Sequence, residues 1–334
     1  MQYKIGAIGR LAKEKGFDVL LQAMAILIKE NLEVSLVIGG EGAEEKNLKN
    51  LAQSLNLSQK VEFLGWVNDL PSFFEKIDIF IVPSKTEPFG LVFLEAMQYK
   101  KPIISSNTDG ANDILEDGKT ALIFNNGDAK DLANKIKHLL SNKKLQQSFI
   151  KNASLKLRDY SFKKVQSELQ KYLSINFSNL DKARPVLNIT YNSRQGGLEK
   201  AFLNYNRLFE SLEFQVINLV PKNAKFIKVL KQKPKSIIYS RFINISFCYF
   251  FYKFYLRGKF KKIAPSLIIA HNARFANLLL SATNIPIIFI NHGGSVKKML
   301  NGKYFFTVNK RTAKELEGFG KEPSKIAYIP NFLE

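Results

Sequence analysis

The sequence predicts an α/β protein of two doubly wound domains, and three observations indicate it. Short apolar runs alternate with segments of helical periodicity along most of the chain, which is typical of parallel sheets covered by helices on both faces. Residues 174–184 have no clear period and are expected to form a linker, so the alternation falls into two halves. A length of 334 residues also exceeds what one small core needs and suits two domains.

The first half, residues 1–173, contains apolar runs of strand length separated by amphipathic segments of helix length. The expected strands are Lys4–Ile8, Val34–Ile38, Val61–Leu64, Ile79–Val82, Ile103–Ser105 and Ala121–Phe124. Helices are expected between them, for example Phe17–Lys29, Glu45–Leu55 and Ala129–Leu140. Residues 142–173 are basic and also expected to be helical.

The second half, residues 185–334, repeats the alternation and predicts a second parallel sheet. Its expected strands are Val186–Thr190, Gln215–Leu219, Ser236–Tyr239, Leu267–Ala270, Ile287–Ile290, Tyr304–Val308 and Ala327–Ile329.

Residues 78–97 predict a strand, a loop and a helix that together suit anion binding. Ile79–Val82 indicate a strand buried on both faces, and Pro83 ends it because proline cannot donate to the sheet. The helix begins near Gly90, and the backbone amides of Gly90, Leu91 and Val92 belong to its first turn. Such amides lack an intrahelical acceptor, and with the helix dipole they favour a phosphate at the carboxyl edge of the sheet.

Charged side chains are expected at the same edge. Arg10 follows the first strand and Lys15 precedes the next helix, so both cations can grip phosphate oxygens there. Glu87 lies in the loop before Gly90, and Glu95 in the helix can accept hydrogen bonds from a ribose diol. The alternative is that these are ordinary solvated surface charges.

The composition limits the classes of function. A net charge of +21 implies an anionic partner, although an AT-rich genome would also enrich lysine. The single cysteine, Cys248, rules out an intramolecular disulfide, and no Cys/His cluster predicts a metal site. The first residues contain no basic region followed by an apolar run, so a cytoplasmic protein is expected.

The segment Glu-Pro-Phe-Gly-Leu-Val-Phe-Leu-Glu-Ala-Met, residues 87–97, resembles the Glu-x7-Glu motif of retaining glycosyltransferases with the GT-B fold, a family 4-like class also described as glycosyl transferases group 1. The resemblance implies two Rossmann-like domains and transfer of a sugar from a nucleotide diphosphate to a hydroxyl. It implies that Glu87 lies against the donor sugar and that Glu95 holds the ribose. Gly-Arg-Leu at residues 9–11 and Lys15 resemble the family's diphosphate clamp.

Three further segments carry the resemblance. Trp66 and Val67 resemble the family's segment beside the nucleotide base, although an edge-of-core tryptophan is an equal alternative for Trp66. Gly196 and Gly197 resemble the glycine loop that faces the diphosphate across the cleft. His292, followed by Gly293 and Gly294, resembles the histidine that reaches the donor sugar, and His271 at the end of a neighbouring strand is given little weight.

The two halves stand in an order that is inverted relative to the family. Residues 1–173 resemble its normally C-terminal donor domain, and residues 185–334 resemble its normally N-terminal acceptor domain. The chain also stops near Pro330 and Asn331, where a family member would continue to its Gly-Arg-Leu strand. We therefore expect a circularly permuted transferase. A fusion of two transferase fragments is the alternative.

Residues 239–262 are unusually aromatic and basic. As a helix they would carry Phe247, Phe250, Phe251 and Phe254 along one side with lysines and arginines near the end, a pattern that suits contact with anionic lipid. The equal alternative is a core helix with a solvated basic end.

These observations together predict a retaining glycosyltransferase that uses a nucleotide-sugar donor and a glycan or lipid-linked acceptor, such as lipopolysaccharide or another cell-envelope glycan. The resemblance implies that no metal or other cofactor is needed. We expect the protein in the cytoplasm, at the inner face of the cytoplasmic membrane. A non-catalytic module that binds nucleotide sugars or anionic lipids remains an alternative, and no recognised motif predicts nucleic-acid binding.

Overall fold

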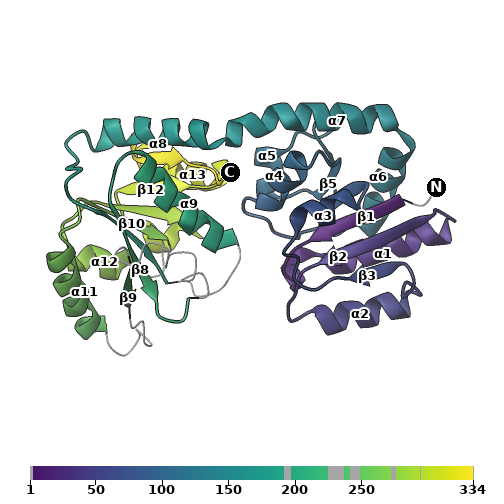
Figure 1. Ribbon diagram of the computed structural model, residues 1–334, viewed down its shortest axis with the longest axis horizontal. Coiled ribbons are helices and arrows are strands. Elements are labelled where there is room, and N and C mark those ends of the chain that lie inside the picture. The colour runs from purple at the N-terminus through teal and green to yellow at the C-terminus, as the bar shows by residue number, and fades with distance from the viewer. Residues whose placement is uncertain are drawn as a thin grey trace. The chain divides into compact units, whose positions relative to one another are not determined.

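A computed structural model describes residues 3–191, 197–224, 237–240, 249–271, 276–293 and 295–333 (Figure 1). The chain forms two compact units. One consists of Met1–Tyr160 with Leu333, and the other consists of Ser161–Phe332 with Glu334. Each is an α/β unit built on its own sheet, and each is described by itself below.

The sheet of the first unit has the strand order β3-β2-β1-β4-β5-β6, and all neighbouring strands are parallel. Its strands are β1 (Tyr3–Ile8), β2 (Val34–Gly39), β3 (Val61–Phe63), β4 (Ile79–Val82), β5 (Ile103–Ser106) and β6 (Leu122–Phe124). This is the order of a Rossmann fold, in which the direction of strand succession reverses between β1 and β4. All four residues of β4 are buried, as their continuous apolar run predicts.

Helices cover both faces of this sheet, and all of them precede Tyr160. They are α1 (Phe17–Lys29), α2 (Glu45–Ser54), α3 (Leu70–Glu75), α4 (Leu91–Gln98), α5 (Asp109–Ile114), α6 (Ala129–Ser141) and α7 (Lys143–Lys156), with a 3-10 turn, η1 (Lys13–Lys15), before α1. One apolar cluster joins α1 and α6 to the strands, and Leu20, Leu27 and Ile136 are fully buried in it.

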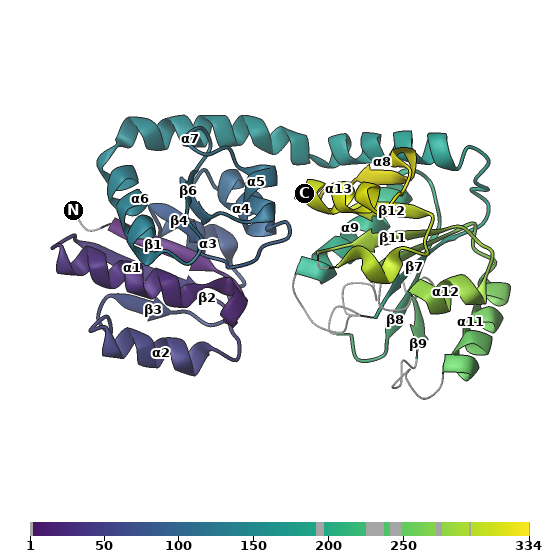
Figure 2. The ribbon, with the colours of Figure 1, turned by 180° about the vertical axis from the view of Figure 1, so that it is seen from behind.

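The second unit repeats the arrangement, with the parallel order β13-β12-β11-β10-β7-β8-β9 (Figure 2). Its strands are β7 (Val186–Thr190), β8 (Val216–Pro221), β9 (Ile237–Ser240), β10 (Leu267–His271), β11 (Ile287–Asn291), β12 (Tyr304–Thr307) and β13 (Ile326–Tyr328). Its helices are α8 (Phe162–Asn176), α9 (Gly197–Ser211), α11 (Tyr249–Ile263), α12 (Ala276–Ala282) and α13 (Lys310–Gly318). The reversal point here lies between β7 and β10. The prediction of two Rossmann-like domains is therefore confirmed.

The units divide after Tyr160, earlier than the expected boundary at residue 173. Helix α8, which the sequence assigns to the first domain, belongs to the second unit because its apolar residues Leu169, Tyr172 and Leu173 pack in that unit's core. The Tyr172 hydroxyl also donates to the carbonyl of Lys325 at 2.7 Å.

The sequence predicts a helix over residues 239–262, but the structure divides this stretch. Strand β9 extends to Ser240 and α11 begins only at Tyr249, while residues 241–248, including Phe247 and Cys248, lie outside the described residues. Within the described ranges, no helix combines the length and the apolar character that crossing a bilayer requires.

Candidate functional site

The predicted anion site of the first unit lies at the carboxyl ends of β1 and β4, where the strand order reverses. Open parallel sheets bind ligands at such a point because the loops that leave the two strands diverge and expose their backbone and side chains. The loop after β1 leads into η1, which carries Lys15. The loop after β4 carries Glu87 and leads into α4.

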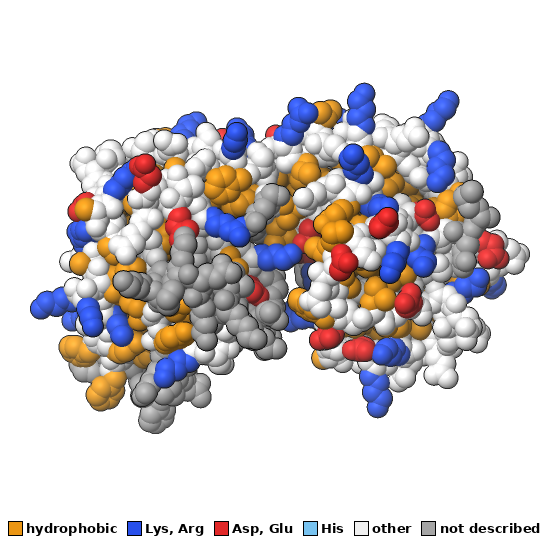
Figure 3. Space-filling model, in the orientation of Figure 1, with side chains coloured by type: hydrophobic (Ala, Val, Ile, Leu, Met, Phe, Trp, Pro, Cys, Tyr) orange, Lys and Arg blue, Asp and Glu red, His pale blue; other side chains and the backbone are white. Residues whose placement is uncertain are grey.

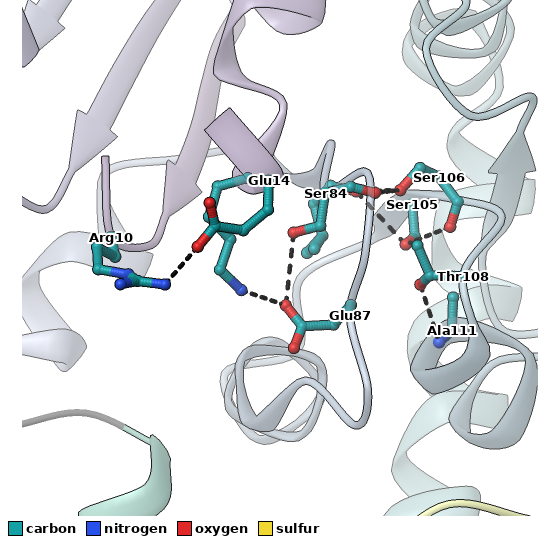
Figure 4. A network of polar contacts seen from close by, with 10 residues as sticks. Arg10, Glu14, Ser84, Glu87, Ser105, Ser106, Thr108 and Ala111 are labelled. Carbon is teal, nitrogen blue, oxygen red and sulfur yellow. Dashed lines mark hydrogen bonds and ion pairs between the residues drawn. The ribbon is translucent and has the colours of Figure 1, made fainter. Parts of the chain in front are cut away.

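Lys15 and Glu87 form an ion pair that joins these two loops. The Lys15 Nζ atom lies 2.5 Å from the Glu87 Oε2 atom, and the side chains are 23% and 10% exposed. The Ser84 hydroxyl donates to the same carboxylate oxygen at 3.4 Å (Figure 4). Both charged groups are therefore fixed at the reversal point with part of their surface open to a ligand.

The backbone holds the Glu87 loop in place from two sides. The amide of Gly110 at the start of α5 donates to the Glu87 carbonyl at 2.8 Å, and the amide of Lys85 donates to the Glu14 carbonyl at 2.8 Å. The Lys85 ammonium also pairs with Asp18 at 2.9 Å. The position of the Glu87 carboxylate is thus set by hydrogen bonds on both sides of its loop.

Gly16 permits the close approach of η1 to the strand end. Its φ angle is +65°, and a Cβ atom at this position would lie 2.0 Å from the carbonyl oxygen of Pro83. Glycine has no Cβ atom, so it adopts a positive φ without steric cost and does not clash with the carbonyl oxygen. This contact brings Lys15 within reach of Glu87.

Gly90 determines where α4 begins. It is the N-cap with a φ of +85°, and a Cβ atom there would lie 2.5 Å from the ring of Phe93 and 3.0 Å from Glu87. Leu91 and Val92 follow as the first residues of the helix and are partly exposed. Their amides belong to the turn that lacks intrahelical acceptors, so this end of α4 favours an anion.

The side chain of Arg10 is 58% exposed and forms an ion pair with Glu14 (Figure 4). An exposed pair of this kind contributes little to stability, so the guanidinium can exchange its partner for a phosphate at small cost. Arg10 lies in the segment that follows β1, and Lys15 lies in η1 directly after it.

Glu95 and Trp66 differ sharply in exposure. Glu95 lies on α4 and is 5% exposed, which is rare for a carboxylate and requires specific partners. Trp66 is 53% exposed in the loop after β3. Trp66 and Val67 line a cavity of about 310 Å³ beside α3. The indole is therefore half exposed beside the apolar side chains of this cavity, a position that suits both stacking on a base and an edge-of-core tryptophan.

The second unit brings two histidines together at the carboxyl edge of its own sheet. His271 ends β10 and His292 follows β11, the strand beside it. The His271 Nδ1 atom lies 2.9 Å from the His292 Nε2 atom, and the rings are stacked with centroids 5.0 Å apart. The sequence predicted that His271 ends a neighbouring strand, but not that it contacts His292. One sequence signal could have predicted this pair: a histidine stands at the carboxyl end of each of two strands that follow one another.

Aromatic rings surround His271 and keep the pair uncharged. Phe202 and Tyr205 of α9 contact its ring edge-on, each with centroids 5.1 Å away. Burial lowers the pKa of His292 to about 4, and burial together with the neighbouring His292 lowers the pKa of His271 well below its ordinary value. Two neutral rings suit the short contact, because one nitrogen donates and the other accepts.

Gly197 begins α9, and no atom lies within 4 Å of a Cβ atom added at this position. The partner predicted with it, Gly196, lies outside the described residues. In the described part of the chain, no group of three or more His, Cys, Asp or Glu side chains is arranged to hold a metal ion.

Comparisons with known proteins find a family model and several relatives that are similar to the first unit. Residues 1–156 match the family model described as glycosyl transferases group 1. An uncharacterized glycosyltransferase of Haemophilus influenzae is 31% identical over 48% of this chain and 46% of its own length. The lipopolysaccharide core biosynthesis glycosyltransferase LpsE of Rhizobium meliloti is 34% identical over 42% of this chain and 40% of its own.

A further relative and a solved structure illustrate the similarity. The capsular polysaccharide biosynthesis glycosyltransferase CapM of Staphylococcus aureus is 32% identical over 44% of this chain and 39% of its own. The structure of Anabaena HepE in complex with UDP and glucose is 26% identical, with a TM-score of 0.49 over 52% of this chain and 48% of that one. The chain thus spans less than half the length of the curated relatives it matches.

We expect Gly16→Ala to destabilise the protein more than a matched glycine substitution. Gly118 has nearly the same φ, +70°, but nothing lies within 4 Å of its added Cβ atom. Gly118→Ala should therefore cost only the left-handed conformation, about 1–2 kcal/mol. Gly16→Ala adds the clash with Pro83 and should cost more of the free energy of unfolding, measured by chemical denaturation. Equal losses would contradict the close approach.

The histidine pair predicts that stability falls as the pH falls from about 6.5 towards 4. In this range the folded histidines stay neutral while those of the unfolded chain take up protons, so the unfolded state binds more protons. Each histidine lowers the free energy of unfolding by up to about 1.4 kcal/mol per pH unit.

Scanning calorimetry between pH 7 and pH 5 tests this expectation. His271→Phe should flatten the pH dependence, whereas His138→Gln, which changes an exposed histidine of α6, should leave it unchanged. Identical slopes for the wild type and His271→Phe would show that the pair does not titrate as proposed.

Proposed function

We propose that this chain, whose residues 1–156 match the family model of glycosyl transferases group 1, moves a sugar from a nucleotide diphosphate to a hydroxyl of an acceptor. The observation that carries the proposal is the partly open Lys15–Glu87 pair beside the amino-terminal end of α4, at the point where the strand order reverses. This arrangement offers positive charge and backbone amides to a diphosphate, and a carboxylate to the sugar next to it.

Each residue of the first unit then has a proposed role. Lys15, Arg10 and the amides of Leu91 and Val92 neutralise the negative charge that develops on the leaving diphosphate. Glu87 contacts the donor sugar. The ribose hydroxyls bind Glu95, and the base lies at Trp66 and Val67. These cationic groups supply the charge that the diphosphate requires, so we propose that the reaction uses no metal or other cofactor.

For the second unit, we propose that His292 contacts the donor sugar and that Gly196 and Gly197 approach its diphosphate. A neutral imidazole can donate or accept a hydrogen bond from a sugar hydroxyl without adding charge. We also propose that the anomeric configuration is retained, which the resemblance of residues 87–97 to the Glu-x7-Glu motif supports.

The acceptor that we propose is a glycan or lipid-linked glycan of the cell envelope, such as lipopolysaccharide. The support comes from the relatives LpsE and CapM, whose names give lipopolysaccharide core and capsular polysaccharide biosynthesis. The exposed rings of Phe251 and Phe254 on the basic helix α11 support peripheral contact with an anionic membrane. The proposed location is the cytoplasm, at the inner face of the cytoplasmic membrane.

We further propose that the two units are the halves of one transferase in circularly permuted order. The support is that the unit matching the group 1 model comes first, while a second Rossmann-like unit with a histidine at its sheet edge follows it. A fusion of two transferase fragments, and a binding module without turnover, are the alternatives that the experiments below separate.

Lys15→Met should weaken nucleotide diphosphate binding by roughly 10- to 100-fold, because a hydrogen bond to a charged group contributes about 1.5–3 kcal/mol. The matched control is Lys13→Met, which removes an exposed lysine from the same turn and should leave affinity unchanged. Calorimetric titration with UDP, GDP and ADP measures both and identifies the base. Equal affinities for the two variants would overturn the proposed role of Lys15.

Turnover separates an enzyme from a binding module. Glu87→Gln should leave nucleotide affinity within about a factor of a few but lower donor-sugar hydrolysis by about 100-fold or more, by analogy with the loss of one group that stabilises the transition state. The non-catalytic module is favoured if the wild-type protein binds nucleotide sugars but neither hydrolyses them nor transfers the sugar to any tested acceptor.

The permuted arrangement predicts a monomer that binds one nucleotide sugar per chain. Light scattering with small-angle X-ray scattering measures the mass and compactness, and titration gives the stoichiometry. Swapped dimers or elongated particles would instead support a fusion of two fragments whose units do not act on the same ligand.

A further inference from the structure

We propose that a pocket at the amino edge of the second sheet, lined by Arg184, Arg257 and Lys261, binds a phosphate group. The pocket measures about 470 Å³ and lies between the start of β7, the end of α11 and the segment after α12. Besides the three cations, its lining includes the polar residues Ser281, Thr283 and Asn284 and no carboxylate.

Arg184 is held in place at this site. Its Nε atom donates to the carbonyl of Ala264 at 2.8 Å, and its Nη2 atom donates to the carbonyl of Pro265 at 2.9 Å. These bonds use only part of the guanidinium's donor set and fix its plane. A guanidinium oriented in advance loses little freedom when it binds phosphate oxygens as a fork.

Arg257 and Lys261 stand one turn apart on α11, so their side chains extend from the same face of the helix. Arg257 donates to the carbonyl of Ser281 at 3.3 Å, which ties it to the opposite wall of the pocket. Lys261 is exposed beside it. Three cations from two segments thus surround one concave site.

The sequence that contains α11 is poor in carboxylates. Residues 214–314 contain no aspartate or glutamate, although this stretch includes α11 and most strands of the second sheet. A bias of the genome towards lysine does not by itself remove carboxylates. Like charges that gather without counter-ions destabilise a fold, and a bound anion relieves that repulsion.

The pocket is distinct from the proposed sugar site of the same unit. His271 and His292 lie at the carboxyl ends of β10 and β11, whereas the pocket lies where these strands begin. A strand of five residues separates the two edges by roughly 15 Å. The inference therefore does not depend on the proposed transferase activity.

Exposed aromatic rings adjoin the pocket and indicate one source of the phosphate. The guanidinium of Arg257 lies 5.9 Å from the ring centroid of Phe254, which is 53% exposed, and Phe251 one turn earlier is 76% exposed. In Figure 3, orange and blue side chains lie together over the region where Figure 1 draws α11. Rings beside a phosphate site suit a lipid headgroup, while a soluble phosphate monoester shares the same chemistry.

The test compares two double variants that remove the same charge from the same helix. Arg257→Gln/Lys261→Gln changes the pocket, and Lys253→Gln/Lys262→Gln changes cations of α11 that do not line it. One arm measures binding of glycerol phosphate to the full-length protein by calorimetry, in the Lys15→Met background so that the first unit contributes little. The other arm measures co-sedimentation with vesicles of phosphatidylcholine containing about a third phosphatidylglycerol, against phosphatidylcholine alone.

We expect the pocket variant to lose at least about tenfold in affinity in one arm and the control to stay within about twofold of the unsubstituted protein. Loss in the glycerol phosphate arm identifies a soluble phosphate ligand. Loss confined to the vesicle arm identifies a lipid headgroup, and Phe251→Ser/Phe254→Ser should then also abolish sedimentation. The inference is overturned if nothing binds in either arm, or if both double variants weaken binding equally, since the effect would then be one of net charge.

Discussion

The ion pair between Lys15 and Glu87 is the interaction on which the candidate site of the first unit depends. It connects the loops that follow β1 and β4, the two strands between which the sheet order reverses. At 23% and 10% exposure the two side chains are shielded more than the exposed Arg10–Glu14 pair, so screening by solvent is weaker. Part of both side chains remains exposed, so an anion can compete for the Lys15 ammonium.

Backbone geometry makes this pairing possible. The positive φ of Gly16 and its approach to Pro83 bring Lys15 to the loop, while Gly90 turns the chain into α4 directly after Glu87. The site is therefore assembled from short segments whose positions are fixed by sheet hydrogen bonds. Such an arrangement costs little reorganisation when a ligand binds, which is a general requirement for electrostatic stabilisation.

The second unit uses the same topology for different chemistry at each of its edges. At the carboxyl edge, aromatic neighbours keep His271 and His292 neutral, so this edge offers hydrogen bonds without charge. At the amino edge, cations gather without carboxylates around a concave pocket. The large net charge is thus not spread evenly, and its concentration near α11 suits an anionic surface or ligand.

The sequence by itself determined the fold class, the order of strands and helices, and much of the first unit's site. Apolar periodicity locates each strand to within about two residues, because burial in a parallel sheet requires continuous apolar runs. Arg10, Lys15, Glu87 and Gly90 follow from their places after strand ends, since parallel strands end at one edge. Only the tertiary structure decided that α8 belongs to the second unit, that His271 contacts His292, and that Arg184 and Arg257 line the same pocket. These arrangements bring together residues that are far apart in the sequence. They depend on strand register and on packing between elements, which no local sequence pattern encodes.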